Sequence, residues 1–155
     1  MIAGNSAILK DVVGQMKPYY TKGVIMIVSN PVDVLVYQCT KWMGLPNGMV
    51  FGTGCILDSS RFTRLIADYT HLNTEVVKAT IVGEHGDAQI PIWSRASIAG
   101  VPLQEYCENV GLKWDEEIRK EISDKVREMG ATIIKGKGRT HYGICLLYTS
   151  DAADE

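Results

Sequence analysis

The stretch GVIMIVSNPVDVL, residues 23–35, decides the fold class. Its first half is a short apolar run rich in β-branched side chains, which is typical of a strand buried on both faces of a parallel sheet. Pro31 suits the first turn of a helix, and apolar residues then recur on one helical face until Gly44. The stretch therefore predicts a strand, a turn and a helix.

The same alternation continues on both sides of this stretch. The predicted helices cover 5–20, 31–43, 58–70 and 114–137, and the predicted strands cover 23–30, 49–54, 76–83 and 89–98. Between the last strand and the last helix, residues 100–111 are predicted to form a loop. Alternating strands and helices in the first part indicate an α/β layered fold with parallel pairing there.

Composition and charge exclude several classes of partner. Sixteen Lys and Arg against 18 Asp and Glu give a formal net charge of -2, which leaves no positive excess to neutralise a nucleic-acid backbone. No apolar run reaches membrane-spanning length, and the N-terminus lacks a secretory signal. The four cysteines show neither zinc-site nor disulfide spacing. We therefore expect a cytoplasmic protein that binds neither nucleic acid nor a membrane.

Two groups of polar residues in the first half of the chain could carry chemistry. Asn30 follows the strand 23–30 at its carboxyl end, where open α/β sheets bind ligands, although it could also serve only to cap the next helix. Asp58 and Arg61 lie three residues apart, on one helical face. The guanidinium could bind a carboxylate through two parallel hydrogen bonds, or it could form an ion pair with Asp58 inside the helix.

A third position is the histidine of G-E-H-G-D, residues 83–87. Flanking glycines leave the imidazole of His85 approachable, and histidine is suited to proton exchange near neutral pH. A metal site built from Glu84, His85 and Asp87 is disfavoured, because consecutive ligands do not readily converge and H-E-x-x-H spacing is absent. A plain turn histidine stays open as an alternative.

The charged residues and the histidine together suggest more than each one alone. A catalytic histidine needs a buried carboxylate to orient it, and an anionic substrate needs a fixed arginine. Asp58, His85 and Arg61 would supply that set. The hypothesis requires all three side chains to meet in one hollow at the rim of the sheet, which no sequence rule guarantees.

Three segments carry a resemblance to a known family: IVSNPVDVL (27–35), FGTGCILDSSRF (51–62) and VGEHGDAQIPIWS (82–94). In order and spacing they resemble the motifs of NAD-dependent L-lactate dehydrogenases, within the lactate/malate dehydrogenase family. The resemblance implies that residues 1–54 are the C-terminal part of a Rossmann-type parallel sheet that binds NAD. It also implies that residues 55–144 are part of an α+β substrate domain.

The resemblance also implies a role for each matching residue. It assigns His85 as the proton donor and acceptor, and Asp58 as the carboxylate that holds it. It assigns substrate binding to Arg61, which would hold the carboxylate, and to Asn30 and Thr140. The positions implied beside the nicotinamide are Val28, Ser29, Asn30 and Thr53. The implied reaction converts pyruvate and NADH into L-lactate and NAD, with no metal, in a cytoplasmic enzyme that is a homotetramer.

Parts of the family pattern are absent from this sequence. The G-x-G-x-x-G turn for the pyrophosphate and the mobile loop that reads the substrate side chain do not occur in it. Malate or a branched 2-hydroxy acid therefore stays open as the substrate, and a truncated chain without activity is a further alternative. Thr63 stands where bacterial relatives carry an arginine for fructose 1,6-bisphosphate, which makes allosteric activation doubtful. The tail 145–155 is interpreted as a translated sequencing adaptor rather than native sequence.

Overall fold

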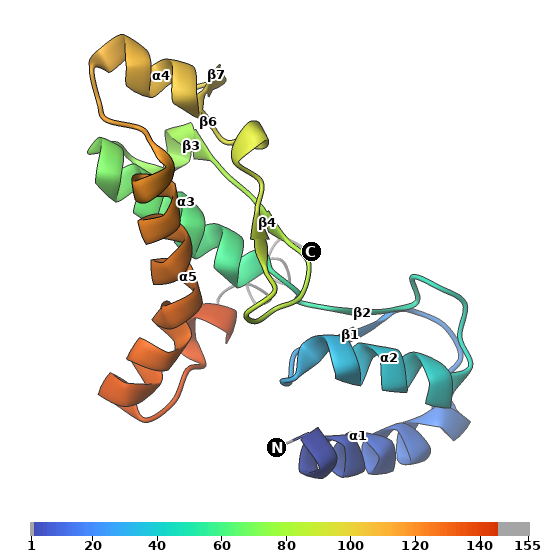
Figure 1. The fold of residues 1–155 in the computed structure, drawn as a ribbon. Coiled ribbons are helices and arrows are strands. Elements are labelled where there is room, and N and C mark those ends of the chain that lie inside the picture. The colour runs from blue at the N-terminus through green and yellow to red at the C-terminus, as the bar shows by residue number, and fades with distance from the viewer. Residues whose placement is uncertain (1, 146–155) are drawn as a thin grey trace. The chain divides into compact units, whose positions relative to one another are not determined.

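The computed structural model describes residues 2–145 and divides the chain into two compact units, Met1–Gly54 and Cys55–Glu155 (Figure 1). The tail that the sequence predicts to be foreign lies outside the described residues from position 146 onward. Each unit has its own hydrophobic core, and each is described by itself.

The first unit is a two-stranded parallel sheet with helices. Its elements are α1 (Ile2–Met16), η1 (Lys17–Tyr19), β1 (Ile25–Ile27), α2 (Val32–Met43) and β2 (Val50–Gly52). β1 pairs with β2 in parallel, with Ile25 opposite Val50 and Ile27 opposite Gly52. The predicted parallel pairing and α/β class are confirmed. Both strands are shorter than predicted, because the ladder between them extends over three residue pairs.

One face of this sheet packs against α2. The core contains Val13, Ile27, Val32, Leu35, Cys39, Met43 and Val50. Gly52 allows the close approach, since a Cβ there would lie 2.5 Å from Cγ2 of Val32. Met26 points the other way and is 41% exposed, as strand alternation requires. α2 ends at Gly44 in the left-handed conformation, as its sequence predicts.

In the described residues, the second unit joins three α-helices and two short 3-10 helices, η2 and η3, to short antiparallel strands. Its helices are α3 (Ile56–Thr70), η2 (Thr74–Val76), η3 (Trp93–Arg95), α4 (Leu103–Val110) and α5 (Glu116–Lys137). Its strands are β3 (Val77–Lys78), β4 (Ile81–Val82), β5 (Ile90–Pro91), β6 (Ser97–Ile98) and β7 (Val101–Pro102). β4 and β5 form an antiparallel hairpin around the turn that carries His85, and β3, β6 and β7 form a second antiparallel sheet.

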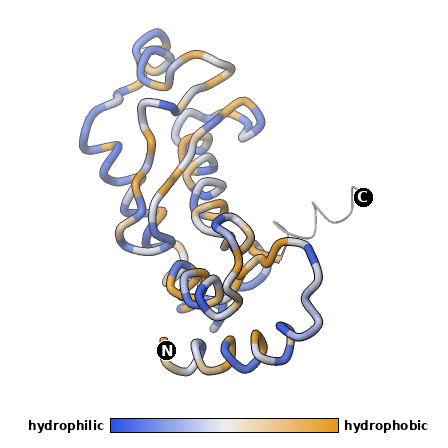
Figure 2. The backbone as a smooth tube through the Cα atoms, turned by 90° about the vertical axis from the view of Figure 1, so that its right-hand side faces the viewer, coloured by the Kyte–Doolittle hydropathy of each residue, from blue (hydrophilic) through white to orange (hydrophobic). Residues whose placement is uncertain are grey.

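The core of this unit lies between α3, α5 and the strands. It contains Phe62, Ile66, Ala67, Val77, Ile81, Ala96, Ile98, Leu103, Cys107, Ile122 and Val126. Phe62 meets Trp93 edge to face, with ring centroids 4.7 Å apart. Along the helices hydrophobic and hydrophilic residues alternate at helical spacing, as the colouring of Figure 2 shows.

The prediction of a loop over 100–111 is wrong, because α4 occupies Leu103–Val110. Leu103 and Cys107 are four residues apart, and both are buried on the same helical face. Gly111, with φ of 72°, ends the helix. The glycines and the proline that flank residues 103–110 make the segment look like a loop in the sequence. The burial of Leu103 and Cys107 marks it as a helix, and that burial is visible only in the folded chain.

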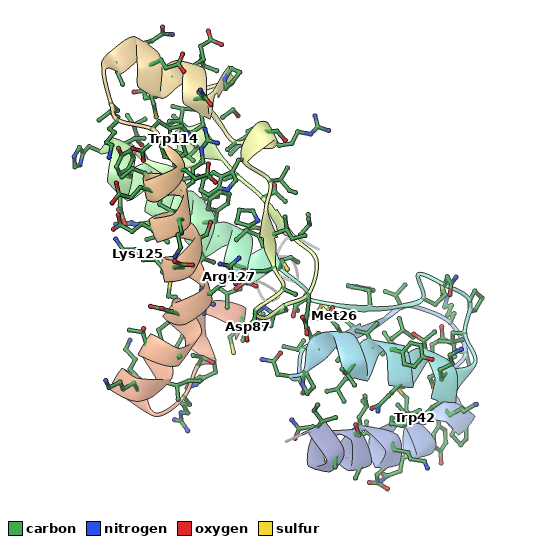
Figure 3. The ribbon with its side chains drawn as sticks, in the orientation of Figure 1. Met26, Trp42, Asp87, Trp114, Lys125 and Arg127 are labelled. Atoms are coloured by element: carbon green, nitrogen blue, oxygen red, sulfur yellow. The ribbon has the colours of Figure 1, made fainter. Side chains whose placement is uncertain are left out.

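α5 runs beside α3 and begins two residues later than predicted. Asp115 caps it by accepting a hydrogen bond from the backbone N–H of Ile118 at 3.1 Å. The hydrogen bond from Lys113, together with that backbone bond, lowers the pKa of the Asp115 carboxyl. Trp114 lies just before the helix, and Lys125 and Arg127 follow along it (Figure 3). Among residues 2–145, no helix combines the length and apolarity needed to cross a bilayer.

Candidate active site

The first turns of α3 carry two charged side chains that contact each other. Asp58 is 2% exposed, and the guanidinium of Arg61 donates from Nη1 to its Oδ1 at 3.3 Å. The intrahelical ion pair that the sequence offered as an alternative is therefore present. It uses only one oxygen of the carboxylate, so it leaves the second oxygen for another partner.

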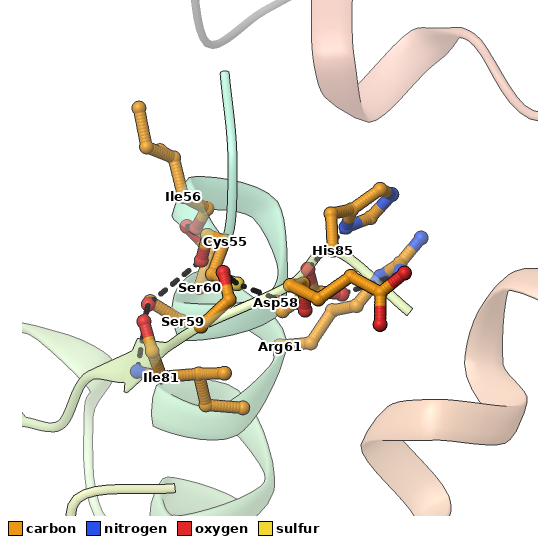
Figure 4. A network of polar contacts seen from close by, with 10 residues as sticks. Cys55, Ile56, Asp58, Ser59, Ser60, Arg61, Ile81 and His85 are labelled. Carbon is orange, nitrogen blue, oxygen red and sulfur yellow. Dashed lines mark hydrogen bonds and ion pairs between the residues drawn. The ribbon is translucent and has the colours of Figure 1, made fainter. Parts of the chain in front are cut away.

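That second oxygen faces His85. Nδ1 of His85 lies 2.5 Å from Oδ2 of Asp58, although the two residues are 27 positions apart (Figure 4). An ionised carboxylate only accepts hydrogen bonds, so Nδ1 is the donor and carries the proton of the neutral ring. Nε2 is then the ring nitrogen that Asp58 does not contact, and it is the atom suited to proton exchange with a ligand.

The charges of this cluster favour an anion once the histidine is protonated. With a neutral imidazole, the guanidinium and the carboxylate cancel. With a protonated imidazole, two positive groups share one buried negative group, and the cluster carries a net charge of about +1. Asp58 stabilises the imidazolium by direct contact. The cluster can therefore bind an anionic ligand and donate a proton to it.

Ser59 connects the two elements that carry these side chains. Its hydroxyl donates to the carbonyl of Cys55 at 2.8 Å and accepts a hydrogen bond from the backbone N–H of Ile81 at 2.9 Å. Cys55 approaches the far end of β4, with Sγ 3.4 Å from the carbonyl oxygen of Gly83. These contacts hold the start of α3 against β4, from which the His85 turn begins. Sequence reasoning missed both residues, since a helical serine and a lone cysteine carry no distinguishing pattern.

Gln89 is a third residue that the sequence did not indicate. It is 4% exposed, and its Oε1 has no hydrogen-bond partner among residues 2–145. Its backbone carbonyl accepts a hydrogen bond from Arg127 of α5 at 3.5 Å. The part of the chain that the structure describes holds no group of three His, Cys, Asp or Glu side chains arranged to bind a metal.

The predicted nicotinamide residues lie in the first unit, at the carboxyl ends of its two strands. Val28, Ser29 and Asn30 follow β1, and Thr53 follows β2 and donates its backbone N–H to the carbonyl of Ile27 at 3.1 Å. Pro31, not Asn30, occupies the N-cap position of α2. The capping alternative for Asn30 is therefore wrong, and its side chain is exposed.

This edge fits one end of a dinucleotide. Exposed Ser29 and Asn30 offer hydroxyl and amide groups at the carboxyl edge of a parallel sheet, where such cofactors bind. A glycine-rich turn for the pyrophosphate does not occur in the sequence. In the second unit, Thr140 is exposed and lies two residues beyond Gly138, where α5 ends.

Comparison with known proteins identifies the family. Residues 55–148 match the family model of the lactate/malate dehydrogenase alpha/beta C-terminal domain, and residues 1–52 match that of its NAD-binding domain. The chain belongs to the lactate/malate dehydrogenase family. The resemblance inferred from the motifs is confirmed, and so is the fold: the end of a Rossmann NAD-binding domain followed by part of the α/β C-terminal domain.

Members of the family that are similar to this chain are about twice its length. An L-lactate dehydrogenase of Moorella thermoacetica is 39% identical over 146 residues, which are 94% of this chain and 46% of that protein. The solved L-lactate dehydrogenase of Clostridium thermocellum gives a TM-score of 0.80 at 43% identity, over 94% of this chain and 46% of the other. Malate dehydrogenase of Plasmodium falciparum gives 0.86 at 35% identity, over 94% and 47%. The chain thus spans under half the length of these dehydrogenases.

The link through Ser59 leads to a testable prediction. Replacing Ser59 with Ala leaves the N–H of Ile81 without its partner, so the free energy of unfolding should fall by about 1–3 kcal/mol in urea denaturation followed by circular dichroism. Ser60→Ala is the matched control, because the Ser60 hydroxyl is exposed and, among residues 2–145, bonds only to the carbonyl of Ile56 in its own helix. Equal effects of the two substitutions would contradict the assigned role.

Proposed function

We propose that this chain is the central part of an enzyme that interconverts pyruvate and L-lactate with NADH and NAD. The observation that carries the proposal is the contact of one buried carboxylate, Asp58, with both an imidazole and a guanidinium. Reduction of a 2-oxo acid needs a proton donor beside the keto oxygen and a cation for the carboxylate. His85 and Arg61 provide these two groups from one cluster.

His85 is proposed as the acid and base of the reaction. Protonated at Nε2, it would polarise the keto oxygen of pyruvate and then give that oxygen its proton, and in the reverse direction it would accept the proton from lactate. Asp58 fixes the ring through Nδ1 and stabilises its charged form. When bound, NADH would supply the hydride for the keto carbon.

Arg61 is proposed to bind the substrate carboxylate. Its Nη1 is held by Asp58, and its side chain is 12% exposed, so the guanidinium is already oriented before the acid arrives. A guanidinium can offer a carboxylate two parallel hydrogen bonds, which fix the orientation as well as the position of the substrate. Asn30 and Thr140 are proposed to complete substrate binding, and Val28, Ser29 and Thr53 to contact the nicotinamide end of NAD.

The domain limits, the localisation and the assembly of the whole protein also belong to this proposal. We place residues 1–54 in the NAD-binding domain and 55–144 in the substrate domain. We also propose a cytoplasmic homotetramer that binds neither nucleic acid nor a membrane. Malate dehydrogenase is the second candidate, supported by the high structural similarity to the Plasmodium falciparum enzyme.

Kinetics of a chimera test the residue roles. Residues 1–144 would replace the matching segment of the Moorella thermoacetica enzyme, so that the rest of the protein is supplied. We expect His85→Ala to lower kcat by about 10²–10⁴-fold, and Arg61→Lys to raise KM for pyruvate by about tenfold or more, because the two-pronged contact is lost. Arg64→Lys is the control, since Arg64 is exposed and pairs with Asp68. A folded chimera in which neither site substitution changes turnover would refute the proposal.

Substrate choice is tested in the chain extended by the upstream codons of its own gene. The values of kcat/KM for pyruvate, oxaloacetate and branched 2-oxo acids would be compared in the presence of NADH. The lactate assignment predicts the highest value for pyruvate. A higher kcat/KM for oxaloacetate than for pyruvate would identify the protein as a malate dehydrogenase.

The 155-residue chain alone is expected to be inactive. It lacks the pyrophosphate turn, and Val24, Met26 and Phe51 leave an apolar face of the two-stranded sheet exposed. We therefore expect no pyruvate-dependent oxidation of NADH, measured at 340 nm, by the purified chain. Activity that disappears in His85→Ala would show this expectation to be wrong and would still support the role of His85.

A further inference from the structure

Asn5, near the start of α1, reaches the turn that follows β1. Its side-chain Nδ2 donates a hydrogen bond to the backbone carbonyl of Asn30 at 2.6 Å, across 25 positions of the sequence. Asn5 is half-buried, whereas Asn30 is exposed at the carboxyl edge of the sheet. The contact therefore acts on the backbone of Asn30 and not on its amide side chain.

The backbone around Asn30 has few other constraints. Among residues 2–145, the carbonyl of Asn30 accepts no hydrogen bond from a backbone N–H. Pro31, the next residue, has no N–H to donate, and the last residue pair of the β1–β2 ladder joins Ile27 to Gly52. The side chain of Asn5 is thus the group that holds this carbonyl in place.

α1 is a firm base for this contact. Oγ of Ser6, the residue next to Asn5, donates to Oε1 of Gln38 in α2 at 2.6 Å. Val13, further along α1, is 3% exposed and belongs to the core that α1 shares with α2. α1 is therefore joined at two points to the helix that follows Asn30, so the amide of Asn5 is oriented before a ligand binds.

We propose that Asn5 is a positioning residue that fixes Asn30 for ligand binding at the edge of the sheet. The inference rests on the proposed function, in which Asn30 helps to bind the 2-oxo acid. A side chain moves with its own backbone, so holding the carbonyl of Asn30 restricts the directions that its amide can take. A displacement of about 1 Å at such a position can lower the rate of a reaction about 100-fold. Asn5 itself acts only through Asn30.

Replacing Asn5 with Asp tests the inference in the chimera described above. The two side chains have the same shape, but an ionised carboxylate only accepts hydrogen bonds and repels the carbonyl oxygen of Asn30. We expect the dissociation constant of oxamate, an unreactive analogue of pyruvate, to rise about tenfold at saturating NADH, measured by quenching of NADH fluorescence. The value of kcat for pyruvate should fall by about 10–100-fold.

Thermal unfolding separates positioning from a role in the stability of α1. An acidic residue near the N-terminus of a helix is favourable, which opposes the loss of the hydrogen bond, so Asn5→Asp should change Tm little. Gln15→Glu is the matched control, because it makes the same amide-to-carboxylate change in α1, where Gln15 is exposed and bonds to Asp11 of the same helix. Asn5→Gln keeps an amide donor and should retain more oxamate affinity than Asn5→Asp.

Unchanged oxamate binding and turnover in a folded Asn5→Asp chimera, or an equal loss in Gln15→Glu, would overturn the inference. Should Asn5→Asp fail to fold, Asn5→Ala removes the donor without adding a charge, and the same criteria apply to it. If Asn30→Ala weakens oxamate binding while Asn5→Asp does not, the inference alone fails. If Asn30→Ala leaves both oxamate binding and turnover unchanged, the role of Asn30 in the proposed function fails as well.

Discussion

A buried carboxylate with two different partners is the constraint on which the second unit depends. Transferring Asp58 from water into a site where it is 2% exposed is unfavourable unless its oxygens are paired. Arg61 pairs with one oxygen and His85 with the other. Removing either partner would leave a buried charge partly uncompensated. Because the buried carboxylate of Asp58 must be paired, the fold places His85, which can exchange protons, next to Arg61, which can bind an anion.

The framework around Asp58 explains how this geometry is maintained. Asp58 and Arg61 share a helix, so their separation follows from helical spacing. His85 comes from a turn between antiparallel strands, and its position depends on how that turn is held against α3. Ser59 provides this connection, because its hydroxyl accepts a hydrogen bond from the backbone of β4. Phe62, one turn further along α3, anchors the same helix in the core against Trp93.

Capping and core packing both favour the formation of α5. The helix has an aspartate cap, and Ile122 and Val126 are buried in the core, all of which favour its formation. Gly130, within the same helix, is unfavourable there compared with alanine.

The sequence alone determined the class of the fold and the types of residue available for chemistry. Apolar periodicity reports which face of a single element is buried, so the parallel strands and the four long helices could be predicted from residues such as Ile25, Val32 and Ile122. The same periodicity failed over 103–110, where α4 shows too few buried positions to stand out. It also could not decide between an ion pair and a ligand site at Arg61.

Only the tertiary structure decided that Asp58 contacts both Arg61 and His85, and that Gly130 faces the guanidinium. The distance between residues far apart in sequence depends on how a turn and two helices pack together, and spacing along the chain does not encode it. The sequence therefore supplied the charged groups and the approximate positions of the long helices and of the two parallel strands. The packing of α3 against β4 and α5 brought those groups into one cluster.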